Sequence, residues 1–130
     1  MNLFKWLGNT NKPRTRGSVS QVTVGNIQRE WQNIKVLMDG KSPSQLRQAV
    51  ISADKTLDNA LRDLVSGESM GERLKNAKDL FPWELYDKIW KAHKMRNSLV
   101  HESGFEPPYF VIQEAVETLR RGLQVLRVNV

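Results

Sequence analysis

The sequence predicts an all-α protein: an up-and-down four-helix bundle with an additional short helix. Two observations lead to this fold class. Apolar residues recur at helical spacing along most of the chain, and no segment alternates apolar and polar residues over a sustained stretch. The 130 residues include 39% hydrophobic and 26% charged side chains, a balance typical of one globular domain with its own core. Because the predicted helices are joined by short loops, consecutive helices should run antiparallel.

The first two helices are predicted from their ends as well as from their periodicity. The first covers residues 19–39, and Gly40 suits the position just after a helix. Ser42 then has the properties of an N-cap, with Pro43 at the first helical position and Gln45 completing a capping box. This second helix should run to about residue 66. Its apolar stripe consists of Leu46, Ala49, Val50, Ala53, Leu57, Ala60, Leu61 and Leu64.

The second half of the chain predicts a short helix and two long ones. The short helix is expected within residues 70–80, after Gly67 ends the preceding helix. Pro82 can open the next helix, which should end at about residue 103, before Gly104. A loop over residues 105–108 leads to the last helix. Its apolar stripe consists of Ile112, Ala115, Val116, Leu119, Leu123 and Leu126.

Residues 1–18 are expected to form a flexible basic tail ahead of a domain that spans residues 19–130. The apolar residues near the start are interrupted by Lys5 and end at Gly8, so they are too few for a signal peptide or a membrane span. We therefore expect a cytoplasmic protein. The alternative for the tail is contact with a membrane surface, in which apolar side chains enter the lipid and basic ones bind headgroups.

The composition narrows the possible functions. The net charge is +6, but Lys5, Lys12, Arg14 and Arg16 supply most of it, so the charge is poor evidence that the domain binds nucleic acid. The absence of cysteine excludes disulfides, thiol nucleophiles and cysteine metal sites, and two histidines are too few for a His-rich cluster. Glycine-rich phosphate loops and paired-acid motifs are also absent. No metal or cofactor is therefore expected.

Polar residues interrupt the apolar face of the helix that follows Pro82. His93, Arg96 and Asn97 lie within its apolar stripes, where a charge is costly unless something pairs with it. Asn97 and His101 are four residues apart, so Asn97 could orient the imidazole and fix its tautomer. Arg96 and His101 are separated by about 140° around the helix axis, so both could reach one groove without stacking on each other.

The segment Arg96-Asn97-Ser98-Leu99-Val100-His101 resembles the motif of the HEPN superfamily, an arginine and a polar residue followed by a histidine. The resemblance extends over about residues 20–128 and includes the motif's position on a late helix of a small bundle. It implies an HEPN-like homodimer that brings two motifs together. Many members are metal-independent endoribonucleases of toxin–antitoxin, phage-defence or RNA-processing systems. Others lack demonstrated chemistry or accompany small nucleotidyltransferases, so an antitoxin or a nucleotidyltransferase is a possible partner protein.

The chemistry of these side chains suits RNA cleavage. An imidazole with an ordinary pKa near 6.5 moves protons near neutral pH, and a guanidinium binds phosphate oxygens through its planar fork. We therefore expect His101 to be the general acid or base, Arg96 to bind the scissile phosphate and Asn97 to orient His101. A requirement for the 2′-OH would make the substrate RNA. Further RNA contacts are expected from Lys91, Lys94 and His93.

Each candidate also has a structural interpretation. Arg96 could pair with a buried carboxylate, for which Asp54 is the candidate because it lies beside the apolar stripe of the second helix. His93 could be a satisfied, half-buried histidine, and the lysines could form a solvated face. Asp54 and Glu102 are accordingly predicted to be structural or supporting groups. The competing function is a non-catalytic HEPN-like module that binds a nucleotide or a protein.

Overall fold

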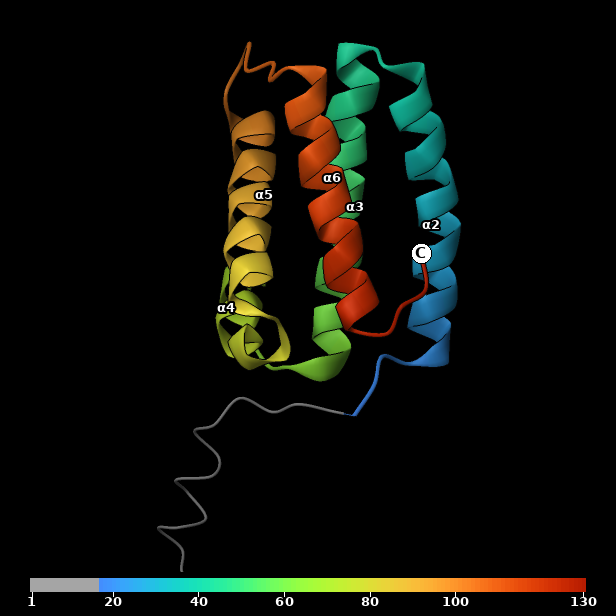
Figure 1. The fold of residues 1–130 in the computed structure, drawn as a ribbon, viewed down its shortest axis with the longest axis vertical. Helices are drawn as coiled ribbons and strands as arrows, with labels where there is room; N and C mark the ends of the chain where they lie inside the picture. Colours follow the sequence, from blue (N-terminus) through green and yellow to red (C-terminus); the bar gives the residue numbers. More distant parts are fainter. Residues whose placement is uncertain (1–16) are drawn as a thin grey trace, which may run out of the picture.

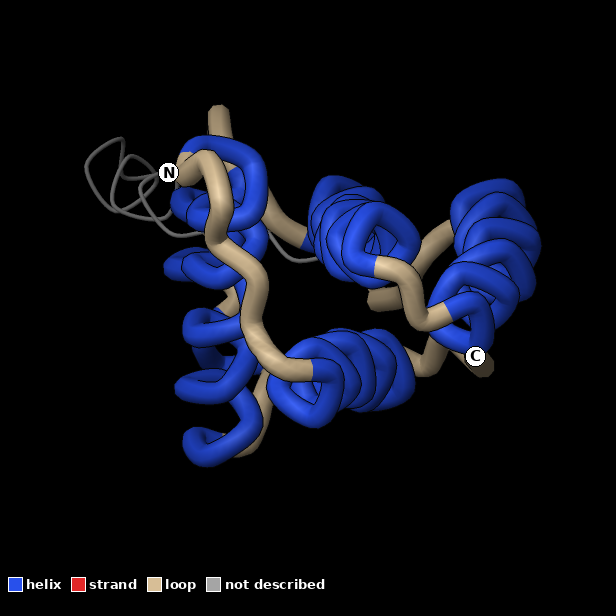
Figure 2. Tube along the Cα trace, turned by 90° about the horizontal axis from the view of Figure 1, so that it is seen from above, coloured by secondary structure: helices blue, strands red, loops and turns tan. Residues whose placement is uncertain are grey.

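The computed structural model describes residues 17–130, and every regular element among them is a helix, as Figure 2 shows. This confirms the predicted all-α class. The expectations for a flexible tail and its membrane contact lie outside the described residues. The elements are α2 (Gln21–Gly40), α3 (Pro43–Leu64), α4 (Met70–Asn76), the 3₁₀ turn η1 (Lys78–Leu80), α5 (Trp83–His101) and α6 (Tyr109–Val125). None of these helices is long and apolar enough to cross a bilayer.

The four long helices alternate in direction along the chain (Figure 1). Helix α3 lies at the centre, since it packs against α2, α5 and α6, and α5 also packs against α6. The short helix α4 packs on α3 near the end where α5 begins. Because α3 also packs against α5, residues far apart in the sequence meet between them, such as Asp54 and His93.

The helix ends follow the predicted signals to within one or two residues: α2 begins at Gln21 rather than 19, α3 ends at Leu64 rather than 66, and α5 ends at His101 rather than 103. The Ser42 hydroxyl accepts from the Gln45 backbone N–H at 3.2 Å, and the Gln45 side chain completes the capping box. Gly40, however, is the last residue of α2, and Lys41 takes the left-handed conformation with φ 61°. A Cβ at position 40 would meet the far end of the Gln45 side chain, which would have to shift. The predicted C-terminal residue of this helix was therefore wrong by one position.

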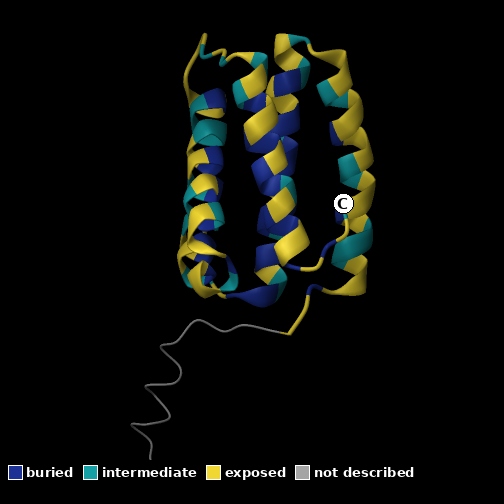
Figure 3. Ribbon diagram, viewed as in Figure 1, coloured by how far each residue is buried: buried dark blue, intermediate teal, exposed yellow. Residues whose placement is uncertain are grey.

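The core runs along the inner faces of the long helices, and Figure 3 shows the buried residues facing one another across the molecule. Helix α6 approaches α5 closely at Gly122, where a Cβ would lie 3.0 Å from Ile89 Cδ1. Not all of the buried residues are apolar. Four charged or titratable side chains are buried where α3, α4 and α5 meet, namely Asp54, Asp58, Arg73 and His93.

Candidate functional site

A polar groove of about 780 Å³ lies between α3, α5 and the beginning of α4. We call it the α3–α5 groove. Its charged lining has more basic than acidic side chains, which favours an anionic ligand. The basic ones are Lys55, Arg62, Arg73, Lys94 and Arg96, and the acidic ones are Asp54, Asp58 and Glu68.

Two carboxylates on α3 form the polar floor of this groove. Asp54 and Asp58 are one helical turn apart, and only 2% and 9% of their surfaces are exposed. A buried carboxylate must be compensated by hydrogen bonds or cations, because burial otherwise favours its neutral form. Each of these aspartates is compensated by a different set of residues, and the two sets differ in geometry.

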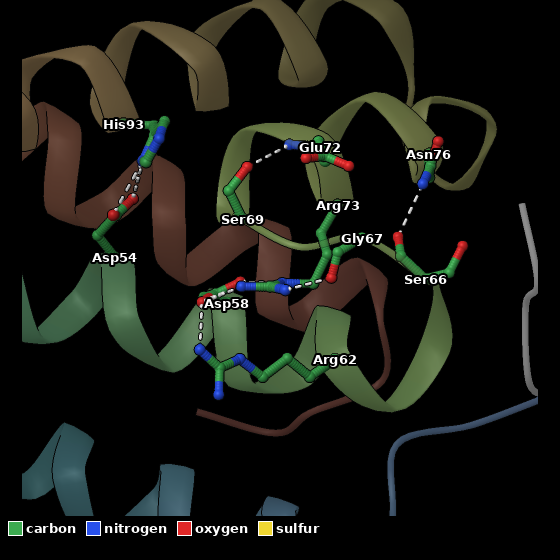
Figure 4. Close-up of polar contacts among 10 residues, drawn as sticks. All are labelled: Asp54, Asp58, Arg62, Ser66, Gly67, Ser69, Glu72, Arg73, Asn76 and His93. Carbon is green, nitrogen blue, oxygen red and sulfur yellow. Dashed lines mark hydrogen bonds and ion pairs between the residues drawn. The ribbon is translucent and has the colours of Figure 1, made fainter.

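Asp58 holds Arg73 of α4 in a two-pronged pair (Figure 4). Arg73 Nε donates to one carboxylate oxygen at 2.6 Å, and Nη2 donates to the other at 3.0 Å. The remaining Nη1 donates to the Gly67 carbonyl at 2.7 Å. These hydrogen bonds to the Asp58 carboxylate raise the pKa of Arg73 above its ordinary value. Since all three nitrogens are engaged and only 8% of the side chain is exposed, this arginine joins α4 to α3.

Asp54 holds His93 of α5, as Figure 4 also shows. His93 Nδ1 lies 3.0 Å from Oδ2 and 3.3 Å from Oδ1 of the carboxylate. An ionised carboxylate can only accept, so Nδ1 carries the proton in this contact. The ring is also held by Trp90, which stands edge-on to it at a centroid distance of 6.0 Å. The imidazole is therefore fixed in position, with its Nδ1 edge on α3.

Arg96 is held more loosely by the same carboxylate. Its Nε lies 3.8 Å from Asp54 Oδ2, too far for a hydrogen bond, and Nη1 donates to Asn97 Oδ1 at 3.0 Å. Within residues 17–130, the buried Nε has no hydrogen-bond partner and nothing accepts from Nη2. The side chain is 35% exposed at the groove. Nη2 of the guanidinium is thus open to a ligand with acceptor oxygens.

The structure brings together some of the predicted site residues and separates others. Those that line the α3–α5 groove are Arg96, Asn97, His93, Lys94 and Asp54. Lys91 points elsewhere and pairs with Asp87 at 3.0 Å on the surface. His101 is the last residue of α5 and Glu102 is its C-cap, and both are exposed and outside this groove.

The expected contact between Asn97 and His101 is absent from the described part of the molecule. The Asn97 side chain accepts from Arg96, and the His101 side chain has no hydrogen bond to any residue in the range 17–130. The guanidinium of the adjacent Arg96 lies within reach and occupies Asn97 Oδ1 instead. Asn97 therefore orients Arg96 in this structure.

Sequence reasoning overlooked the Asp58–Arg73 pair. The signal available was the turn that brings α4 back over α3. Gly67 has φ 148°, a conformation that favours glycine, and a Cβ there would lie 2.8 Å from Arg73 Cγ. Ser69 then caps α4 through the Glu72 backbone N–H. A glycine followed by a serine N-cap predicts a tight turn between the two helices. It does not predict which carboxylate of α3 the arginine of the next helix will contact.

In comparisons with known proteins, no family model, no curated protein and no solved structure matches this chain. Function must therefore be argued from the site itself. Among the described residues, no group of three or more metal-ligating side chains has the arrangement of a metal site. What the groove does offer is an open guanidinium, nearby lysines and a fixed imidazole, a set suited to a phosphate ester.

Proposed function

We propose that this chain is an HEPN-like domain of the cytoplasm that binds RNA in the α3–α5 groove and cleaves it without a metal ion. The observation that carries the proposal is the state of Arg96. Its guanidinium is positioned by Asp54 and Asn97, yet Nη2 has no protein partner among the described residues and the side chain is 35% exposed at the groove. An arginine held in this way is prepared for a phosphate group, which accepts two parallel hydrogen bonds from such a fork.

In this proposal each polar residue of the motif has a separate task. Arg96 binds the scissile phosphate and stabilises the charge that develops on it, and Asn97 keeps the guanidinium in place. Lys94, also in the groove, contacts a neighbouring phosphate. His101 moves a proton, because its exposed imidazole can act as a general acid or base toward a bound RNA.

A second copy of the chain completes the site in this proposal. His101 follows Arg96 by five residues, about 7.5 Å along the helix axis, and it lies outside the groove of its own chain. A homodimer through α5 would bring the exposed His101 of one copy toward the groove of the other. An antitoxin or nucleotidyltransferase that covers this face would act as a regulator, in keeping with the HEPN resemblance.

The test is RNA cleavage in the presence of excess EDTA. A fluorescent single-stranded RNA of random sequence is incubated with the full chain and with His101→Ala, Arg96→Met and Lys91→Ala variants. We expect cleavage by the wild type and by Lys91→Ala, and a loss of at least about 100-fold in the other two. A wild type that leaves the RNA intact, or a His101→Ala variant that cleaves it equally well, contradicts the enzymatic proposal.

The position of His101 favours a second candidate, a non-catalytic module that binds a nucleotide or a partner protein. With the histidine outside the groove, Arg96 and Lys94 can bind a phosphate without any proton transfer. This candidate predicts that the wild type binds the same RNA or ATP, that Arg96→Met abolishes binding, and that no product forms. Fluorescence anisotropy alongside the cleavage assay distinguishes the two candidates.

A further inference from the structure

We propose that His93 is a proton-transfer group of this site, and that Asp54 orients it to accept the proton of the ribose 2′-OH. The inference rests on the proposed RNA cleavage and assigns one half of its acid–base chemistry. His101 is left with the other half, the protonation of the leaving oxygen. The two roles require different protonation states, and two histidines in different surroundings can supply them at one pH.

His93 lines the α3–α5 groove, and Asp54 occupies one of its two ring nitrogens. Asp54 engages Nδ1, so the neutral ring carries its proton there and has a lone pair on Nε2. Within residues 17–130, Nε2 has no hydrogen-bond partner and is not a fully enclosed unpaired atom. Because His93 lines the groove, this nitrogen is open to a molecule bound there. A carboxylate on one ring nitrogen and an accessible lone pair on the other are the arrangement of an oriented general base.

The same carboxylate positions the imidazole and the proposed phosphate ligand. Asp54 Oδ2 lies 3.0 Å from His93 Nδ1 and 3.8 Å from Arg96 Nε. The two side chains therefore flank one carboxylate and line one groove within a single chain. His101, by contrast, follows His93 by eight residues, about 12 Å along the helix axis. A phosphate on Arg96 thus has its ribose within reach of His93 rather than of His101 from the same copy.

The reaction balances with these groups. His93 Nε2 takes the proton of the 2′-OH, and the 2′-oxygen forms a bond to phosphorus while the bond from phosphorus to the 5′-oxygen breaks. The 5′-oxygen takes a proton from the imidazolium of His101, supplied by the second copy in the proposed dimer. The products are a 2′,3′-cyclic phosphate and a 5′-hydroxyl end. Proton exchange with water then restores both histidines.

The charges around His93 come from each element that forms the groove. From α5 come Lys94 and Arg96, and from α4 and the segment before it come Arg73 and Glu68; α3 supplies Asp54, Lys55, Asp58 and Arg62. The measured pH dependence of the wild type will include all of them. The contribution of His93 is therefore read from the difference between the pH–rate profiles of the His93 variant and of the wild type.

The first experiment replaces the base and keeps its contact. His93→Asn retains an N–H near Asp54 but has no titrating nitrogen in the groove. We expect kcat to fall by about 100-fold or more with KM changed by less than about threefold, and the rise in rate on the acidic side of the pH profile to disappear. His101→Asn should instead remove the fall on the alkaline side. Cleavage by His93→Asn within threefold of the wild type, with the acidic side unchanged, overturns the inference.

The second experiment uses the unaltered chain and does not depend on cleavage or on the folding of a variant. Nitrogen NMR of the histidines should show His93 with a protonated Nδ1 and an unprotonated Nε2. Addition of a 2′-O-methyl RNA decamer of random sequence, which cannot be cleaved by this route, should shift both His93 Nε2 and Arg96 Nε. A shift at Arg96 without one at His93 overturns this inference and leaves the proposed RNA site standing. A wild type that neither shifts nor cleaves contradicts both.

Discussion

Two aspartates one helical turn apart on α3, Asp58 and Asp54, each face an arginine from another helix, and the two contacts differ in their hydrogen bonds and exposure. Arg73 makes two hydrogen bonds to Asp58 and a third to a carbonyl, with 8% of its side chain exposed. Arg96 lies 3.8 Å from Asp54, keeps a buried Nε unpaired and is 35% exposed. The same two residue types therefore form one contact in which all the arginine nitrogens have partners and one in which some of them do not. The number of hydrogen bonds still available on the guanidinium separates a structural arginine from one that can bind a ligand.

The unpaired Nε of Arg96 has a stability cost that the Asp58–Arg73 pair avoids. A buried donor without a partner costs about 1–3 kcal/mol, and native structures contain few of them. A geometry of the Arg73 type would remove that cost by turning the fork fully onto the carboxylate. His93 occupies the better position on Asp54, however, with Nδ1 at 3.0 Å. The competition for one carboxylate leaves the guanidinium partly free, and this is the feature that a phosphate ligand would use.

The largest expected effect is on stability, from Arg73→Met. Removal of one partner of a buried ion pair leaves an uncompensated charge on Asp58, so the free energy of unfolding should fall by about 3–5 kcal/mol. Denaturant unfolding measures it. The matched control is Arg62→Met, since Arg62 also contacts Asp58, at 3.5 Å, but is 62% exposed. Its loss should cost less than about 1 kcal/mol.

The loss in the free energy of unfolding caused by Arg73→Met should not change with pH between pH 6 and pH 9. The contact with Asp58 raises the pKa of Arg73. A basic group with a raised pKa contributes its stability fully below its unfolded-state pKa, which for an arginine lies far above pH 9, and loses it only as the pH rises through the still higher folded-state value. Unfolding at pH 6 and pH 9 should therefore give the same difference between variant and wild type. A difference below about 1 kcal/mol at both pH values would mean that the pair does not hold α4 to α3.

The matching substitution on the other pair, Arg96→Met, should affect function and leave stability nearly unchanged. Asp54 keeps its hydrogen bond to His93, and an unpaired donor is removed, so we expect the free energy of unfolding to change by about 1 kcal/mol or less. RNA cleavage, or binding if no cleavage occurs, should fall by about 100-fold. If Arg96→Met destabilises the chain as strongly as Arg73→Met, the two pairs are alike and Arg96 is structural.

The fold could be predicted from the sequence because its signals are local. A serine, a proline and a glutamine at residues 42–45 determine the start of α3, and the apolar stripe of that helix determines which face is buried. The end of α2 is an exception: the helix continues through Gly40, and Lys41 takes the left-handed conformation, with its backbone N–H bonded to the Leu37 carbonyl.

The site could be predicted only in part, because its partners come from different helices. The spacing of Arg96 and Asn97 on one helix indicates a polar interruption, and Asp54 could be named as a partner because it borders the stripe of α3. Spacing does not decide whether Asp54 binds histidine or arginine more closely. That choice depends on the packing of α5 against α3, which places the His93 ring between Trp90 and the carboxylate.

The smallest expected effect is a difference in RNA affinity between variants of two lysines of α5, Lys94 and Lys91. Lys94 lines the α3–α5 groove, whereas Lys91 lies outside it and pairs with Asp87. A lysine that contacts a phosphate releases counterions, about 0.7 per contact for a single strand, so its loss flattens the dependence of log affinity on log salt by that amount. We therefore expect Lys94→Ala to weaken RNA binding a few-fold and to flatten this slope. Lys91→Ala should leave both unchanged.

Fluorescence anisotropy over about 50–200 mM salt measures both slopes. The comparison is sensitive because both variants lose the same charge from the same helix. Long-range attraction between the whole domain and RNA would change equally in the two, and only a local contact distinguishes them. Equal slopes for the two variants would place the RNA outside the α3–α5 groove. The open guanidinium of Arg96 would then require a different, smaller ligand, such as a nucleotide phosphate.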